Sequence, residues 1–177
     1  MRAILLYLKC KPSSFDEKLT KPNFGFRLNY YPPLNENDIR SGAGRMLGHE
    51  DVDLFTILPA QDLEGLQVLN RKNMKWVKLH APKGSIVINT GDYMQRISND
   101  IFPSTTHRVS IPETSKQFGK VRISFPMAIY IRENENLEVL PGLGEAHYPP
   151  ISAIEFHTKI TSKYYGDNYA MDEFEKE

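Results

Sequence analysis

The sequence predicts a mainly β fold, either a β-sandwich or a jelly roll. Between residues 24 and 131, short clusters of β-branched and aromatic residues alternate with Pro, Gly and Asn. This pattern is typical of strands joined by turns. The clusters are not separated by long amphipathic helices, which argues against a parallel sheet with helical crossovers.

Eight segments have the composition of strands. They cover residues 24–31, 45–51, 53–58, 66–69, 75–79, 85–89, 104–110 and 120–131. The segment NTGDYMQRISND interrupts the alternation, so we expect a turn and a distorted stretch at residues 90–100. The side chain of Asn89, at the start of this segment, is interpreted as bonding nearby backbone.

Helices are expected at the two ends of the chain. The apolar run from Ala3 to Leu8 is too short for a membrane span or a cleaved signal peptide, and we interpret it as the end of a helix. An imperfect apolar stripe that begins at Ile151 predicts a second helix over residues 151–164. We interpret residues 1–177 as one domain with its core at about residues 24–131.

The charge balance and the cysteine content limit the kinds of ligand and bond that we expect for this chain. The 22 basic residues are balanced by 22 acidic ones, so we expect no general attraction for nucleic acid or an anionic membrane. Cys10 is the only cysteine, which excludes an intramolecular disulfide and a thiolate zinc site and fits a cytoplasmic location.

Polar residues occupy strand positions that a packed sheet normally gives to apolar ones. Because side chains alternate along a strand, His49 and Asp51 share one face. The same spacing relates Arg122 to Ser124, and Asn29 to Tyr31. Burial of such groups is costly unless they are paired or bind a metal, so a ligand-filled cavity is the simpler interpretation.

A third candidate ligand is His107, on another predicted strand. The His-x-Asp pair alone is a weak signal, since short motifs often occur by chance. Two imidazoles and one carboxylate, however, form the facial triad of non-haem Fe(II) oxygenases, which leaves coordination positions for other ligands. Zinc accepts the same donors, although a zinc hydrolase also needs a positioned general base.

These motifs together resemble one enzyme family. The stretches RLNYYPP, GHEDVDLFTIL, STTHRVS and VRISFPMAIY are similar, in the same order, to the C-terminal catalytic half of the isopenicillin N synthase-like, 2-oxoglutarate-dependent Fe(II) dioxygenases. The resemblance implies a double-stranded β-helix (jelly roll) with a short N-terminal helical remnant and a C-terminal helix. It also implies Fe(II) as the metal, 2-oxoglutarate as cosubstrate and O₂ as oxidant.

The resemblance assigns roles to individual residues. His49, Asp51 and His107 become the iron ligands. Arg122 becomes the partner of the distal carboxylate of 2-oxoglutarate, a role for which a planar guanidinium is well shaped. The hydroxyls of Ser124 and Tyr31 are expected at the same carboxylate, with Asn29 near the cosubstrate.

The implied reaction is oxidation of a small organic molecule, by hydroxylation, desaturation or ring formation, in specialised metabolism. Two alternatives stay open: an oxidase like isopenicillin N synthase that uses no 2-oxoglutarate, and a truncated metal-binding fragment without turnover. Typical family members are about twice as long, so we expect their N-terminal region to be missing here. The sheet face that it covers would then favour self-association.

Overall fold

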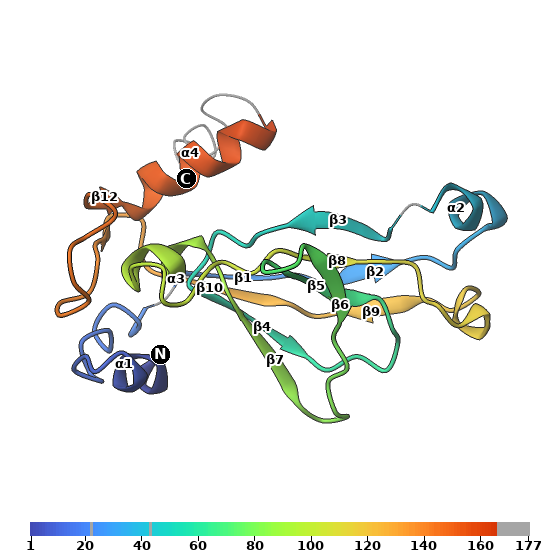
Figure 1. Cartoon of the computed structure of the whole chain (residues 1–177), viewed down its shortest axis with the longest axis horizontal. Coiled ribbons are helices and arrows are strands. Elements are labelled where there is room, and N and C mark those ends of the chain that lie inside the picture. The colour runs from blue at the N-terminus through green and yellow to red at the C-terminus, as the bar shows by residue number, and fades with distance from the viewer. Residues whose placement is uncertain (22, 43, 166–177) are drawn as a thin grey trace.

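Antiparallel strands form the centre of the structure, and helices lie at its ends (Figure 1). The computed structural model describes residues 1–21, 23–42 and 44–165. Within these ranges the strands form two four-stranded sheets and two smaller pairs, all antiparallel. This arrangement confirms the mainly β fold predicted from the alternation of apolar clusters and turn residues.

The first sheet has the order β1-β10-β4-β7, and the second has the order β3-β8-β5-β6. The strands of the first sheet are β1 (Asn23–Phe26), β10 (Met127–Tyr130), β4 (Phe55–Pro59) and β7 (Ile86–Thr90). Those of the second are β3 (Met46–His49), β8 (His107–Val109), β5 (Leu66–Asn70) and β6 (Lys75–Lys78). The smaller pairs join β2 (Asn29–Tyr31) to β9 (Arg122–Ser124), and β11 (Asn136–Leu137) to β12 (Ile151–Ser152).

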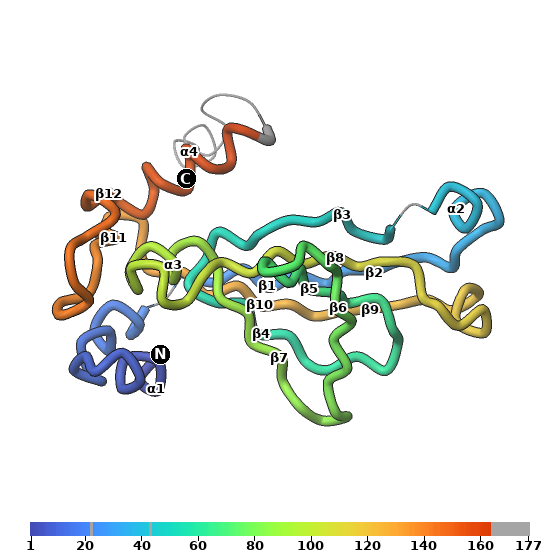
Figure 2. The backbone as a smooth tube through the Cα atoms, in the orientation of Figure 1, coloured from blue at the N-terminus to red at the C-terminus, as the bar shows by residue number. Residues whose placement is uncertain are grey.

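The helices lie at opposite ends of the sheets. The backbone trace in Figure 2 shows α1 (Arg2–Tyr7), α3 (Asp92–Ile97) and α4 (Ala153–Tyr165) at one end, with α2 (Glu36–Ser41) at the other. A 3₁₀ turn covers Ser115–Gln117. The helices predicted at the two ends of the chain are therefore present, and none of the described helices is long and apolar enough to cross a membrane.

Two predicted strands are each divided. The segment predicted as 24–31 forms β1 and β2, and that predicted as 120–131 forms β9 and β10. Pro126 separates the second pair, because proline has no N–H to donate to a sheet. The carbonyl of Pro126 accepts a hydrogen bond from the Arg27 N–H at 3.0 Å, so both chain segments change pairing partners at the same point.

The expectation of a turn and a distorted stretch at residues 90–100 was only partly right, because α3 occupies Asp92–Ile97 and a turn follows at residues 98–100. Six residues are too few to show helical periodicity clearly in the sequence. The helix is stabilised by packing: Tyr93, Met94 and Ile97 are all buried. They belong to the main apolar core, which also includes Leu5 of α1 and Leu137 of β11.

The two faces of the first sheet differ sharply. Cross-strand pairing places Phe26, Met127, Ile57 and Ile88 in one row across the four strands. Phe26 and Ile88, at the two ends of this row, are 62% and 60% exposed. The opposite face carries the buried Thr56, because successive side chains of a strand alternate. An apolar outer face and an inner face with polar positions therefore belong to the same four strands.

Candidate metal and cosubstrate site

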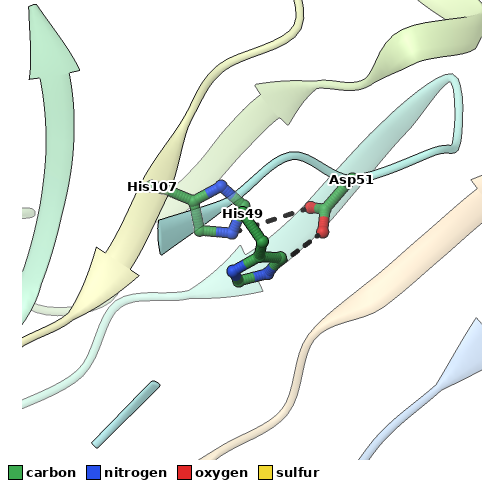
Figure 3. Close-up of side chains that lie close together, drawn as sticks. All are labelled: His49, Asp51 and His107. Atoms are coloured by element: carbon green, nitrogen blue, oxygen red, sulfur yellow. Dashed lines mark ion pairs between the residues drawn. The ribbon is translucent and has the colours of Figure 1, made fainter. Parts of the chain in front are cut away.

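The predicted triad is brought together at the ends of two paired strands (Figure 3). His49 ends β3, His107 begins β8, and the two are direct cross-strand partners. Asp51 follows in the loop after β3. One potential ligand atom from each residue lies within 4.8 Å of the others. Among the described residues, this is the group of His, Cys, Asp and Glu side chains whose geometry suits a metal ion.

Backbone carbonyls orient both imidazoles. Nδ1 of His49 lies 3.0 Å from the carbonyl oxygen of Leu47, and Nδ1 of His107 lies 2.9 Å from that of Thr105. A carbonyl only accepts, so each Nδ1 carries the proton and each Nε2 keeps its lone pair. The Nε2 atoms are 3.6 and 3.9 Å from the Asp51 carboxylate, so the lone pairs and the carboxylate converge on one region. This donor set fits a divalent cation such as Fe(II).

Two residues outside the triad hold the Asp51 carboxylate. Its Oδ2 accepts hydrogen bonds from the Thr56 hydroxyl at 2.7 Å and the Asn89 amide at 2.9 Å. Oδ2 is thereby saturated, which leaves Oδ1 as the oxygen available to a metal. Burial raises the pKa of Asp51, but His107 and these hydrogen bonds outweigh it and hold the pKa below its ordinary value. The carboxylate is therefore an anion.

Thr56 and Asn89 were not predicted from the sequence as supports of Asp51. Both lie on the inner face of the first sheet as direct cross-strand partners. A polar residue within an otherwise apolar strand was the available signal for Thr56. The interpretation of Asn89 as bonding nearby backbone was wrong, because its amide donates to a carboxylate 38 residues away in the sequence.

The short helix α3 fixes the loop that carries Asp51. The Asp92 N–H donates to the Asp51 carbonyl at 2.9 Å, and the Tyr93 N–H donates to the carbonyls of Val52 and Asp53. Gly91 makes this approach possible, since an added Cβ would lie 2.5 Å from the Asp53 carbonyl oxygen. The first turn of α3 therefore hydrogen-bonds directly to the loop that carries Asp51, called here the ligand loop.

Asp53 shares the strand parity of the ligands but lies outside the triad. Its side chain is fully buried, and burial raises the pKa of Asp53 to about 7. Its Oδ2 lies 2.7 Å from the Thr56 hydroxyl. Asp53 is therefore a buried acid beside the metal-binding group rather than part of it.

A second polar cluster lies on the β2–β9 pair. Arg122 is only 1% exposed, and its neighbours Ser124 and Tyr31 are also buried. Arg122 pairs with Tyr31 across the strands, and its guanidinium carbon lies 5.1 Å from the centre of the Tyr31 ring. Asn29 is half-buried and pairs with Ser124.

The Arg122 guanidinium has unused donors. Its Nε and Nη1 are buried and make no hydrogen bond with the residues that the structure describes. Burial lowers the pKa of Arg122, although not enough to discharge a guanidinium. The residue borders a cavity of about 30 Å³ whose other walls include Leu58, Leu66 and Val87. A buried cation with free, forked donors is suited to a carboxylate.

Arg45, which was not predicted from the sequence as a site residue, also lies in this region. Its Nη2 donates to the Lys120 carbonyl at 3.1 Å, while Nε and Nη1 are buried without partners among the described residues. Burial lowers the pKa of Arg45, and the charge of Arg45 in turn lowers the pKa of Arg122. Two neighbouring guanidiniums with unused donors strengthen the preference of this region for an anion.

Comparisons with known proteins identify the family of the chain. The model of the family described as the 2OG-Fe(II) oxygenase superfamily matches residues 22–129, more than half of the chain. The chain is 32% identical over 168 residues to the 2-oxoglutarate-Fe(II) type oxidoreductase ppzC of Metarhizium majus, covering 88% of this chain and 42% of that protein.

A plant relative and a solved structure extend the comparison. A bi-functional coumaroyl CoA and feruloyl CoA ortho-hydroxylase of Ipomoea batatas is 30% identical over 149 residues, covering 84% of this chain and 39% of that protein. The crystal structure of a full-length Neurospora crassa protein in complex with alpha-KG and thymine superposes with a TM-score of 0.83 at 27% identity, covering 93% of this chain and 51% of that chain.

The chain thus spans about two fifths of the length of these curated relatives and half of the solved chain. Three findings indicate the same family. They are the antiparallel jelly-roll core, the His49–Asp51–His107 triad that fits Fe(II), and the matches in sequence and structure. The chain belongs to the 2OG-Fe(II) oxygenase superfamily.

Proposed function

We propose that the chain is an Fe(II)- and 2-oxoglutarate-dependent oxygenase that oxidises a small organic molecule. The proposal rests chiefly on one observation. Three side chains suited to bind a metal converge in the same jelly roll that buries the Arg122 guanidinium, two of whose nitrogens have no hydrogen-bond partner among the described residues. Fe(II) and 2-oxoglutarate together supply the activation of O₂ for this chemistry.

The residues of the chain position these groups. Nε2 of His49, Nε2 of His107 and Oδ1 of Asp51 are the proposed metal ligands, and their hydrogen bonds to the backbone, Thr56 and Asn89 hold them in place. Arg122 is the proposed anchor of the distal carboxylate of 2-oxoglutarate. Ser124 and Tyr31 stand beside it as hydroxyl donors, with Asn29 near the cosubstrate.

Small-molecule substrates are supported by the relatives. The Neurospora crassa structure is a complex with thymine, and the Ipomoea batatas relative is a hydroxylase of coumaroyl CoA and feruloyl CoA. For this chain we propose hydroxylation, desaturation or ring formation on a small molecule of specialised metabolism, in the cytoplasm. The plant relative favours hydroxylation among these outcomes.

The test is the stoichiometry of turnover with Fe(II), 2-oxoglutarate and O₂ across a panel of small aromatic acids and nucleobases. We expect succinate and CO₂ to form in proportion to 2-oxoglutarate consumed, and both to disappear in Asp51→Ala. The matched control is His80→Ala, an exposed histidine outside the site. Oxygen uptake that is independent of 2-oxoglutarate would instead support the oxidase alternative, and tight metal binding without any turnover would support the inactive fragment.

We also propose that the chain self-associates through the outer face of the first sheet. Phe24, Phe26, Ile86 and Ile88 are 58–62% exposed on this face. Exposed apolar patches of this kind favour association. We expect light scattering after size exclusion to give a mass above 20.3 kDa, and Phe26→Lys with Ile88→Lys to lower it. A monomeric wild-type chain at the same concentration would refute this proposal.

A further inference from the structure

The residue between the two ligands of the His-x-Asp motif is itself an acid, Glu50, and it takes no part in the triad. Its Oε1 accepts hydrogen bonds from the Thr106 hydroxyl at 2.6 Å and from Arg71 Nη2 at 2.9 Å. Thr106 immediately precedes the third ligand, His107. One carboxylate oxygen therefore links the segment that carries two ligands to the segment that carries the third.

Arg71 adds a second connection between Glu50 and the segment that precedes His107. It lies in the turn after β5, and its Nη2 also donates to the Ser104 carbonyl at 2.7 Å. Ser104 belongs to the loop that leads into β8. The strand that holds His107 is thus tied to the ligand loop at two points, Ser104 and Thr106, through a single acid.

β8 pairs in regular register with β5 on one side, but its pairing with β3 on the other side gives the His49 segment little support. β8 is three residues long, and its register with β3 shifts between Met46 and His49. Beyond that irregularity, only the pair of His49 with His107 continues the ladder. A β-bulge lets the strands bend and twist locally, so a second constraint is needed to fix the two imidazoles relative to each other.

We infer that Glu50 is a positioning residue that sets the relative placement of the three metal ligands through Thr106 and Arg71. The inference rests on the proposed role of His49, Asp51 and His107 as metal ligands. Groups that orient metal ligands commonly change metal affinity by about 10- to 100-fold when they are removed.

If Glu50 served only to stabilise the fold, its removal would lower the thermal unfolding midpoint rather than change the metal site. The Glu50 and Arg71 side chains are 37% and 48% exposed, and exposed ion pairs contribute little to the stability of a fold. We therefore expect the loss of Glu50 to change the metal site while the thermal unfolding midpoint hardly moves. Metal affinity and ligand geometry, measured on folded protein, separate the two roles.

The experiment titrates the full chain with Co(II), whose visible absorption reports ligand geometry. We expect Glu50→Ala to bind Co(II) about 10-fold more weakly than wild type with an altered spectrum, and Glu50→Gln, which keeps an acceptor for Thr106, to fall between them. Thr106→Val should weaken binding less than Glu50→Ala, because the link through Arg71 remains, and the double variant should be little weaker than Glu50→Ala, which already removes the Thr106 link. The matched control is Glu113→Ala, which breaks the exposed Lys78–Glu113 ion pair away from the triad.

The outcomes separate this inference from the proposed metal site. Wild-type affinity and spectrum in Glu50→Ala, together with lost binding in Asp51→Ala, would overturn the role of Glu50 alone. A wild-type chain that binds no Co(II) would overturn both proposals. If Glu50→Ala does not fold, as judged by circular dichroism, Glu50→Gln and Thr106→Val decide the question by the same two readouts.

Discussion

Replacing Arg122 by Met should abolish cosubstrate binding without weakening the fold. Arg122 is 1% exposed, and two of its guanidinium nitrogens are buried without partners among the described residues. In the absence of a bound anion, such a buried guanidinium destabilises the folded state. Methionine fills the volume of the aliphatic stem and carries no charge.

The expected magnitude follows from opposing contributions to the free energy of unfolding. Relieving a buried unsatisfied group yields about 1–3 kcal/mol. Losing the contact between the guanidinium and the Tyr31 ring, at 5.1 Å, costs up to about 2 kcal/mol. The net change is then a gain of about 1 kcal/mol, or about 2–4 °C in the unfolding midpoint of a chain of this size.

The assay is thermal unfolding with and without 2-oxoglutarate, in the presence of Mn(II) as a redox-inert metal. For wild type, 2-oxoglutarate at about 100 times its dissociation constant should add about 2.7 kcal/mol of stability, whereas Arg122→Met should gain nothing at that concentration. Arg40→Met is the control, since Arg40 is an exposed arginine of α2 that pairs with Glu36. An Arg122→Met protein that loses about 2 kcal/mol or more without ligand, or that keeps the 2-oxoglutarate response, would refute the reasoning.

Three further expectations concern the surroundings of the metal ligands and α4. Gly91→Ala places a Cβ 2.5 Å from the Asp53 carbonyl oxygen and should cost about 1–3 kcal/mol in urea unfolding; unchanged stability would contradict the tight packing described. Asn89→Leu removes a hydrogen bond to Asp51 and should weaken Mn(II) binding about 10-fold in a competitive titration, whereas equal affinity would deny Asn89 its orienting role. Burial lowers the pKa of His157, so the unfolded chain takes up this proton first. The free energy of unfolding should therefore fall as pH drops below about 6.5, and less so in His157→Phe; parallel pH profiles of the two proteins would contradict this.

The sequence was sufficient to single out the pair of His49 and Asp51 because strand alternation is a local property. His49 and Asp51 are two residues apart, the spacing that gives two side chains one face in a regular strand, although the structure ends β3 at His49 and puts Asp51 in the following loop. Arg122 and Ser124 were singled out by the same rule, and the structure buries both side chains. His107 was added by the match to a family pattern, since no local rule connects it to residues so far away in the chain.

The support of the site could not be predicted, because it depends on register between distant strands. Asn89 reaches Asp51 only because β7 pairs with β4 in one particular alignment. Arg45 comes near Arg122 because it bonds the Lys120 carbonyl just before β9, and a single cation before a strand carries no signal of that kind. The helix α3 was missed because packing rather than periodicity stabilises its six residues.

The central claim is that His49, Asp51 and His107 bind Fe(II) in a site that also receives 2-oxoglutarate. The most direct measurement is an anaerobic titration of the chain with Fe(II), with and without 2-oxoglutarate, recorded by visible absorption. A metal-to-ligand charge-transfer band that requires both additions, and that is lost in Asp51→Ala and in Arg122→Met at the same concentrations, is the expected result. A wild-type chain without this band, or a band that persists in Asp51→Ala, would contradict the assignment of the site.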